Sequence, residues 1–297
     1  MTDNINRCPV CKSEVYKYNK MFSKMLDLLN NHTSKVFTCK NCKIHYLWPY
    51  FSKEQLNVLY NKSYFTGNME GENSLEVPTA NIVYQTETSN TRLSKFKDTV
   101  DFLLAEHENA KSILDIGAAT GEFLATAREK GLSISGIELS SYACRKAKAN
   151  FGFEFHQTSL DEYREKEKYD LIHISHVFEH LQFPNKAIDR ISSLLNPNGL
   201  IYIEVPFQFN FVEKIKFKLF RRNKVFDVFS LHHPIFYTPS TLKKVLKAHD
   251  FDCIKLKVFK WSSYPARGMI GNLKRLMWFS LSLFKSGAYM EAIFRKR

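Results

Sequence analysis

Histidine side chains and one carboxylate are gathered where a buried strand is predicted to end. The segment YDLIHISHVFEHLQFP (169–184) starts as a largely apolar run that leads into His176, Glu179 and His180. In open α/β folds the loops after the carboxyl ends of strands face the ligand. Because the pKa of histidine lies near neutral pH, a histidine at this edge can remove a proton from a bound hydroxyl group. We therefore treat His176 and His180 as candidate catalytic residues; an equal alternative for Glu179 and His180 is to brace the start of the next helix.

A second pair of histidines, His232 and His233, stands before a proline in the segment SLHHPIFYTP (230–239). A loop of this kind can fold over a bound acceptor, and its histidines can equally serve as anchors for the loop. We predict that one of His180, His232 and His233 is the general base. His173 alternates inside the strand and is instead predicted to be packed or hydrogen-bonded.

Four cysteines occur as two close pairs, Cys8-Pro-Val-Cys11 and Cys39-Lys-Asn-Cys42, with 27 residues between the pairs. Two C-x-x-C pairs can present four thiolates to one tetrahedral ion and leave no open coordination position. The sequence therefore predicts a structural Zn²⁺ held by Cys8, Cys11, Cys39 and Cys42. Redox-active or free thiols are the alternative, although a redox motif needs only one such pair beside a β-α-β unit.

The segment ILDIGAATGEF (113–123) predicts a buried strand that runs through a glycine turn into a helix. Gly117 and Gly121 permit tight turning where a ligand approaches. The dinucleotide fingerprint G-x-G-x-x-G is not met, because Ala119 replaces its second glycine and Glu122 stands where its third small residue is needed. The turn therefore indicates a nucleotide ligand other than a dinucleotide.

The pattern D-x-G-x-x-x-G at 115–121 resembles motif I of the class I S-adenosylmethionine-dependent methyltransferases. LSISGIEL (132–139), Thr158-Ser159-Leu160, the histidine-bearing strand and LLNPNGLIYIEVP (194–206) follow in the order of that family. The resemblance covers about a hundred residues. It implies an α/β fold with a Rossmann-like seven-stranded methyltransferase sheet, a small amino-terminal zinc-ribbon module, and S-adenosyl-L-methionine as cofactor.

The resemblance also implies which residues hold the cofactor. Glu138 would accept the ribose hydroxyls, and His176 would lie near the methionine portion. The complete implied set is Asp115, Gly117, Ala118 and Gly121 in the turn, Glu138 and Leu139 after the next strand, Ser159 and Leu160 at the adenine, and His176.

The cysteine pairs, the step Trp48-Pro49 and the tyrosines Tyr60 and Tyr64 resemble the zinc-ribbon preface of a bacterial methyltransferase group. Members of that group modify sugars, surface glycans and antibiotic precursors. The resemblance implies O-methylation of a sugar, or of a surface-glycan or lipid-linked intermediate, with a histidine as general base.

Three alternatives stay open. Ubiquinone-type and antibiotic-precursor O-methyltransferases act on small metabolites, and the ubiquinone type uses a related E-x-x-E-H sequence beside a divalent ion. Here His176 replaces its first acid, which disfavours a hard cation. RNA methylation is the second alternative and a non-catalytic cofactor-binding role is the third.

We predict four parts of the chain. They are a zinc-ribbon module at 1–66, a linker with a cofactor-covering helix at 67–110, a class I methyltransferase domain at 111–260 and a basic amphipathic extension at 261–297.

The 297 residues carry a net charge of +13, most of which comes from two late segments. Residues 213–224 include six basic and one acidic residue, and residues 267–297 include seven basic and one acidic residue. Such basic segments can bind anionic membrane lipid, RNA, or an acceptor that carries a lipid pyrophosphate. An ordinary solvated surface explains them equally well.

No signal-peptide pattern and no run of ~20 apolar residues is present in the sequence. We therefore predict a cytoplasmic protein that acts on a sugar, glycan or small-molecule acceptor. Peripheral contact with the inner face of the membrane stays open.

Overall fold

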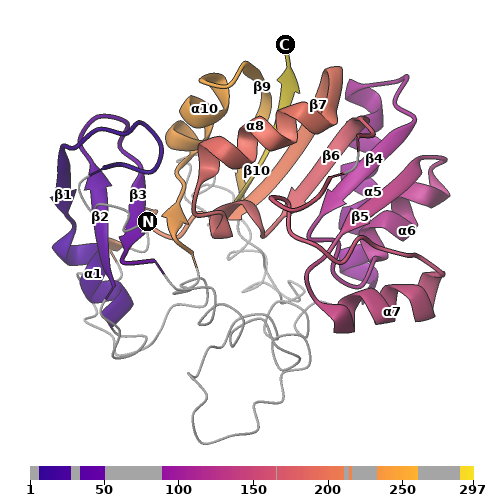
Figure 1. Cartoon of the computed structure of the whole chain (residues 1–297), viewed down its shortest axis with the longest axis horizontal. Helices are drawn as coiled ribbons and strands as arrows, with labels where there is room; N and C mark the ends of the chain where they lie inside the picture. The colour runs from indigo at the N-terminus through magenta and orange to yellow at the C-terminus, as the bar shows by residue number, and fades with distance from the viewer. Residues whose placement is uncertain are drawn as a thin grey trace, which may run out of the picture.

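A computed structural model describes residues 7–27, 34–50, 89–164, 166–210, 214–215, 233–259 and 288–297 of the chain. These residues form a large mixed sheet with helices on both faces and a smaller sheet beside it (Figure 1). His232, Tyr60, Tyr64 and most of the two basic segments lie outside the described residues.

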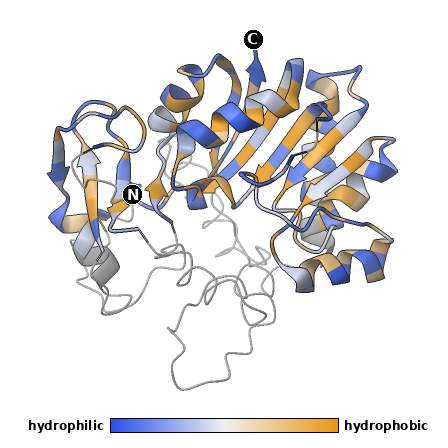
Figure 2. Cartoon of the chain, in the orientation of Figure 1, coloured by the Kyte–Doolittle hydropathy of each residue, from blue (hydrophilic) through white to orange (hydrophobic). Residues whose placement is uncertain are grey.

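The large sheet has the strand order β5-β4-β6-β7-β10-β9. Its parallel part consists of β5 (Ser133–Ile137), β4 (Ser112–Ile116), β6 (Tyr169–Ser175) and β7 (Leu195–Pro206). β10 (Tyr289–Lys296) runs antiparallel to both of its neighbours, β7 and β9 (Phe251–Phe259). Hydrophobic residues dominate the central strands because both faces of the sheet are covered (Figure 2).

Helices cover both faces because successive residues of a strand point to opposite sides. On one face, Ile172 and Ile201 share a buried cluster with α8 (Pro184–Leu194) and α10 (Pro239–Lys247). On the other face, neighbouring residues of the same strands pack with α5 (Ser89–Glu106), α6 (Glu122–Glu129) and α7 (Ser141–Phe151). The predicted α/β fold with a Rossmann-like sheet is thereby confirmed.

The predicted count of seven strands is wrong for the described residues, which supply six strands to this sheet. The segment 153–156 makes one isolated parallel bridge between Ile137 and His156. The N–H of His156 donates to Gly136 O (2.9 Å) and the N–H of Glu138 donates to His156 O (3.1 Å). Pairing at a single residue is too short to form a strand.

The sheet-forming sequence continues past residue 260, into the segment 261–297 that the sequence predicts to be a basic extension. β10 comes from that extension and lies between β7 and β9. Met290, Ala292 and Phe294, every second residue along this part of β10, are buried. This apolar alternation therefore favours a strand in the sheet despite the neighbouring basic residues. Within the described residues, no helix combines the length and the apolar character that crossing a membrane requires.

The smaller sheet has the order β1-β2-β3-β8. Its strands are β1 (Tyr16–Tyr18), β2 (Lys35–Cys39), β3 (His45–Trp48) and β8 (Ile235–Phe236), and α1 (Lys20–Asp27) connects the first two (Figure 1). β8 belongs to a segment that we assigned to the methyltransferase domain. The amino-terminal module and the larger domain therefore share a sheet.

Candidate active site

The glycine turn between β4 and α6 depends on the absence of side chains. Gly117 has φ +82°, and a Cβ atom there would lie 2.3 Å from Cγ2 of Val177. The N–H groups of Gly117 and Ala118 both donate to the carbonyl of Ile137, at 2.8 and 3.1 Å. Gly121 has φ +91° and caps α6. The turn is therefore held tightly against β5, with α6 pointing its amino end toward it.

Glu138 lies directly after β5 and faces this turn. Its carboxylate accepts hydrogen bonds from the N–H groups of Ala119 (2.9 Å) and Ser140 (2.8 Å). Burial raises the pKa of this carboxyl group, and the N–H donors partly oppose the shift. The next side chain, Leu139, is 62% exposed, which leaves an open apolar surface beside the carboxylate.

The two predicted adenine residues differ in their surroundings. The hydroxyl of Ser159 accepts from the N–H of Glu162 at 3.2 Å, which caps a turn. Leu160 is buried in the core on the α8 face.

Asp115 and His173 form a buried pair across neighbouring strands. Oδ1 of Asp115 lies 2.7 Å from Nδ1 of His173. The imidazole of His173 stacks on Phe123 with ring centroids 3.6 Å apart. The prediction that His173 is packed and hydrogen-bonded is confirmed, and Asp115 supports the turn from within the core.

His176 lies at the carboxyl end of β6 in a left-handed conformation, with φ +55°. Its Nε2 atom lies 3.6 Å from Glu204, and its Nδ1 atom lies 3.6 Å from Glu179. Burial disfavours the imidazolium, but the two carboxylates outweigh this effect and raise the pKa of His176 to about 9. This shift favours the protonated imidazole of His176 at neutral pH, and its catalytic role stays a prediction.

Sequence reasoning missed the ion pair that anchors this network. Nζ of Lys95 on α5 lies 2.7 and 2.8 Å from the two carboxylate oxygens of Glu204 on β7. Burial opposes ionisation of Glu204, yet Lys95 and His176 hold its pKa well below the usual range. An acid inside the apolar run LIYIEV was the available signal, because a buried charge requires a partner.

Replacing Lys95 with methionine should lower the free energy of unfolding by about 3 kcal/mol, because it leaves Glu204 buried without its ammonium partner. Lys130 pairs with Asp101 on the surface, where the two side chains are 36% and 54% exposed. Lys130→Met should therefore cost less than about 1 kcal/mol. Urea unfolding of the two variants measures the difference, and equal losses would contradict a structural role for the buried pair.

The second carboxylate of this region, Glu179, is surrounded by histidines. It lies in the short helix η1 (Phe178–His180) and is 2% exposed. Its Oε1 atom is 3.9 Å from Nε2 of His180 and 3.8 Å from Nε2 of His233. Both carboxylate oxygens lack a hydrogen-bond partner among the described residues. We call Glu179, His180 and His233 the acid–histidine cluster.

His233 is oriented by its other ring nitrogen. Nδ1 lies 3.0 Å from Oε1 of Gln208, an arrangement in which Nδ1–H donates and Nε2 faces Glu179. The rings of His180 and His233 meet edge to face at 4.7 Å. Both imidazoles therefore lie where a negative charge would stabilise the imidazolium formed when either accepts a proton.

The fold brings together two of the predicted histidines that are distant in the sequence, His180 and His233. The third candidate, His176, approaches the same carboxylate oxygen, with its Nδ1 atom 3.6 Å from Oε1 of Glu179. Val177 packs against Gly117 of the glycine turn and connects the cluster to that turn. The three cluster side chains also offer ligand atoms within 4.8 Å of one another, so their composition suits a transition-metal ion as well as proton transfer.

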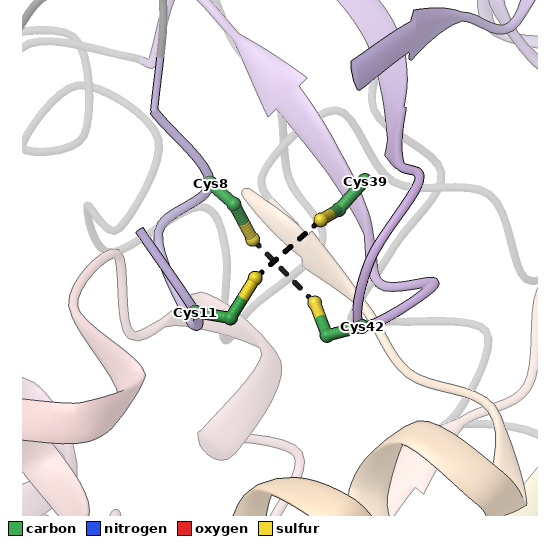
Figure 3. Close-up of side chains that lie close together, drawn as sticks. All are labelled: Cys8, Cys11, Cys39 and Cys42. Atoms are coloured by element: carbon green, nitrogen blue, oxygen red, sulfur yellow. Dashed lines mark hydrogen bonds between the residues drawn. The ribbon is translucent and has the colours of Figure 1, made fainter. Parts of the chain in front are cut away.

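The four cysteines of the amino-terminal module converge on one point (Figure 3). Sγ of Cys8 lies 3.6 Å from that of Cys42, and Sγ of Cys11 lies 3.5 Å from that of Cys39. Sulfurs bound to one ion at ~2.3 Å lie ~3.8 Å apart in a tetrahedron, so this donor set fits Zn²⁺. The contact between Cys8 and Cys42 lowers the pKa of the Cys42 thiol and raises that of Cys8, so the pair shares one proton.

Comparisons with known proteins agree with this fold. The family described as "Methyltransferase domain" matches residues 89–256, more than half of the chain. A ubiquinone biosynthesis O-methyltransferase of Pasteurella multocida is 26% identical over 108 residues, which cover 31% of this chain and 45% of the relative. A malonyl-[acyl-carrier protein] O-methyltransferase of Ilyobacter polytropus is 26% identical over 155 residues, 50% of this chain and 58% of the relative.

The chain thus spans about half the length of these curated relatives. Among solved structures, the plantazolicin methyltransferase BpumL, in complex with S-adenosylhomocysteine (SAH) and a triazolic analogue, superposes with a TM-score of 0.55. That match has 18% identity and covers 79% of this chain and 93% of BpumL, so it shows a common fold. Because the family match spans the glycine turn and most of the large sheet, the chain belongs to the methyltransferase-domain family.

Proposed function

We propose that this protein is an S-adenosylmethionine-dependent O-methyltransferase that acts on a hydroxyl group of a sugar, or of a surface-glycan or lipid-linked intermediate. The observation that carries the proposal is the acid–histidine cluster beside the glycine turn. A buried carboxylate that makes no hydrogen bond within the described residues and lies near two imidazoles is suited to help receive the proton of an acceptor hydroxyl.

The residues present fit the cofactor. The side-chain-free backbone at Gly117 allows close approach, Glu138 offers carboxylate oxygens for ribose hydroxyls, and Leu139 offers an apolar surface for the adenine. When bound, S-adenosylmethionine supplies a methyl group already activated by its sulfonium. The curated relatives carry the name O-methyltransferase, and BpumL was solved with SAH, which supports the same cofactor here.

The residues of this chain would then align the acceptor and accept its proton. His180 or His233 accepts the hydroxyl proton, and Glu179 stabilises the resulting imidazolium. His176, whose pKa is raised by Glu204 and Glu179, would hold the end of β6 in place through its contact with Glu204. Exclusion of water by the surrounding core strengthens these electrostatic effects.

The cysteine cluster would hold a structural Zn²⁺. Four thiolates would fill all four positions of the ion, so this site would provide stability without an open position for an acceptor. The zinc-ribbon resemblance and the convergence of the four sulfurs support the assignment.

The acceptor is tested by comparing cells that carry the intact protein with cells that carry His233→Ala. Mass spectrometry of surface glycans should show a sugar that lacks one methyl group in the variant. An unchanged glycan profile, together with methyl transfer to RNA or to a small metabolite, would contradict the sugar acceptor. Binding of SAH to the purified protein tests the cofactor separately.

A further inference from the structure

We infer that the metal-loaded cysteine cluster positions the histidines that accept the proton, so that loading of the ribbon controls methyl transfer. The inference rests on the proposed function for the catalytic role of His180 and His233. The structural part of the inference is that the amino-terminal cysteine module, here called the ribbon, fixes the positions of His180 and His233. It is based on contacts that join one cysteine pair to each of these histidines.

The second cysteine pair is joined to His233. The N–H of Cys39 donates to the carbonyl of Ile44 at 3.0 Å and closes the turn that starts β3. β3 pairs with β8 in the register His45 to Phe236 and Tyr46 to Ile235. The N–H of Leu47 also donates to the carbonyl of Pro234 at 2.8 Å. The ribbon strand therefore holds the residues that directly follow His233.

β8 depends on this support. It consists of two residues, and among the described residues its one strand partner is β3. A strand this short does not stay in register without a neighbour that is already ordered. Disorder in β3 would therefore remove the strand support of the residues that follow His233 and allow this side chain to shift from its place opposite Glu179.

The first cysteine pair is joined to the segment that carries His180. Nδ2 of Asn185, in the first turn of α8, donates to the carbonyl of Val10 at 2.7 Å. Val10 lies between Cys8 and Cys11, and Asn185 follows His180 by five residues. The first cysteine pair thus contacts the segment that carries His180, and the second pair contacts the segment that carries His233.

The ribbon and the larger domain also share one hydrophobic core. Cys39, Ile44 and Tyr46 belong to the same buried cluster as Ile235 and Tyr237. Tyr237 in turn stacks on Phe178, the first residue of η1, at 5.1 Å. Because packed cores transmit small displacements, a change at the sulfurs reaches η1 and the acid–histidine cluster.

The test removes the metal with a chelator and restores it with Zn²⁺. Misplacement of a catalytic group by about 1 Å can cost about 100-fold in rate. The metal-free protein should therefore lose about 100-fold in kcat, keep SAH affinity within about twofold, and recover when Zn²⁺ is added. Unchanged kcat in the metal-free protein, or equal losses of kcat and SAH affinity, would overturn the inference.

A variant that keeps the metal gives an independent check. Asn185→Leu removes the contact with Val10 and should lower kcat about 10-fold with little change in KM. The control is Asn196→Leu, which removes a 2.8 Å hydrogen bond to Asp170 elsewhere in the domain. Asn196→Leu should leave kcat unchanged; an equal loss in both variants would contradict the special role of the ribbon contact.

Nuclear magnetic resonance of isotope-labelled histidine supplies a readout without turnover. Metal removal should shift the imidazole signals of His180 and His233 while the signal of His249, which pairs with Asp189, stays in place. Unmoved signals would overturn the positioning role. If the intact, metal-loaded protein methylates no acceptor, the proposed function fails, and these signals still decide whether the ribbon positions the histidines.

Discussion

Replacing His233 with alanine should lower kcat by about 10²–10⁴-fold while the affinity for SAH stays within about twofold. Nε2 of His233 faces the buried carboxylate of Glu179 at 3.8 Å, so its loss removes a proton acceptor whose charged form is stabilised. Single-turnover and steady-state kinetics measure kcat, and calorimetry measures binding of SAH.

His180→Ala separates the two imidazoles. Whichever histidine accepts the proton should show the large loss in kcat, and the other should show a smaller loss from altered packing of the two rings. His249→Ala is the matched control, because its imidazole pairs with Asp189 at 2.8 Å outside the acid–histidine cluster. Equal kcat in the intact protein and in both cluster variants would contradict a histidine base.

Replacing Gly117 with alanine should destabilise the fold by about 2–5 kcal/mol and weaken binding of SAH. The left-handed backbone at φ +82° costs an alanine about 1–2 kcal/mol. The new Cβ atom would also meet Val177 at 2.3 Å, and relief of such overpacking costs about 1–3 kcal/mol more. Urea unfolding measures the stability, and calorimetry measures the binding.

Gly131→Ala isolates the conformational part of this effect. Gly131 has φ +88°, and a Cβ atom there meets nothing within 4 Å. Its replacement should cost about 1–2 kcal/mol and leave SAH affinity unchanged. If both variants lost the same stability and the same affinity, the close approach of Val177 to the turn would be irrelevant to cofactor binding.

Local sequence patterns predicted the core of the fold well. The strand, glycine turn and helix around Asp115 follow from apolar runs and from two glycines, and these signals act within a few residues. β10 could not be assigned in the same way, because its place between β7 and β9 depends on pairing with strands that precede it by many residues. The pairing of β8 with β3 is equally non-local.

The candidate site was predicted residue by residue but not as an arrangement. His176, His180 and His233 were each identified as reactive side chains, yet the sequence could not show which of them face the same carboxylate. The role of Lys95 was missed because a lysine in a predicted helix is normally expected to lie in solvent. Its partner, Glu204, is fixed only when α5 packs on the sheet.

The position of β10 affects how the protein folds during its synthesis on the ribosome. β10 is the last strand of the sheet to be synthesised, yet among the described residues it separates β7 from β9. Until it emerges, the 12-residue β7 presents an open, apolar edge, and β9 lacks the one strand neighbour that it has among the described residues. Such an edge pairs readily with other chains. Nascent chains stalled before β10 should therefore aggregate or recruit chaperones, whereas chains released after it should not.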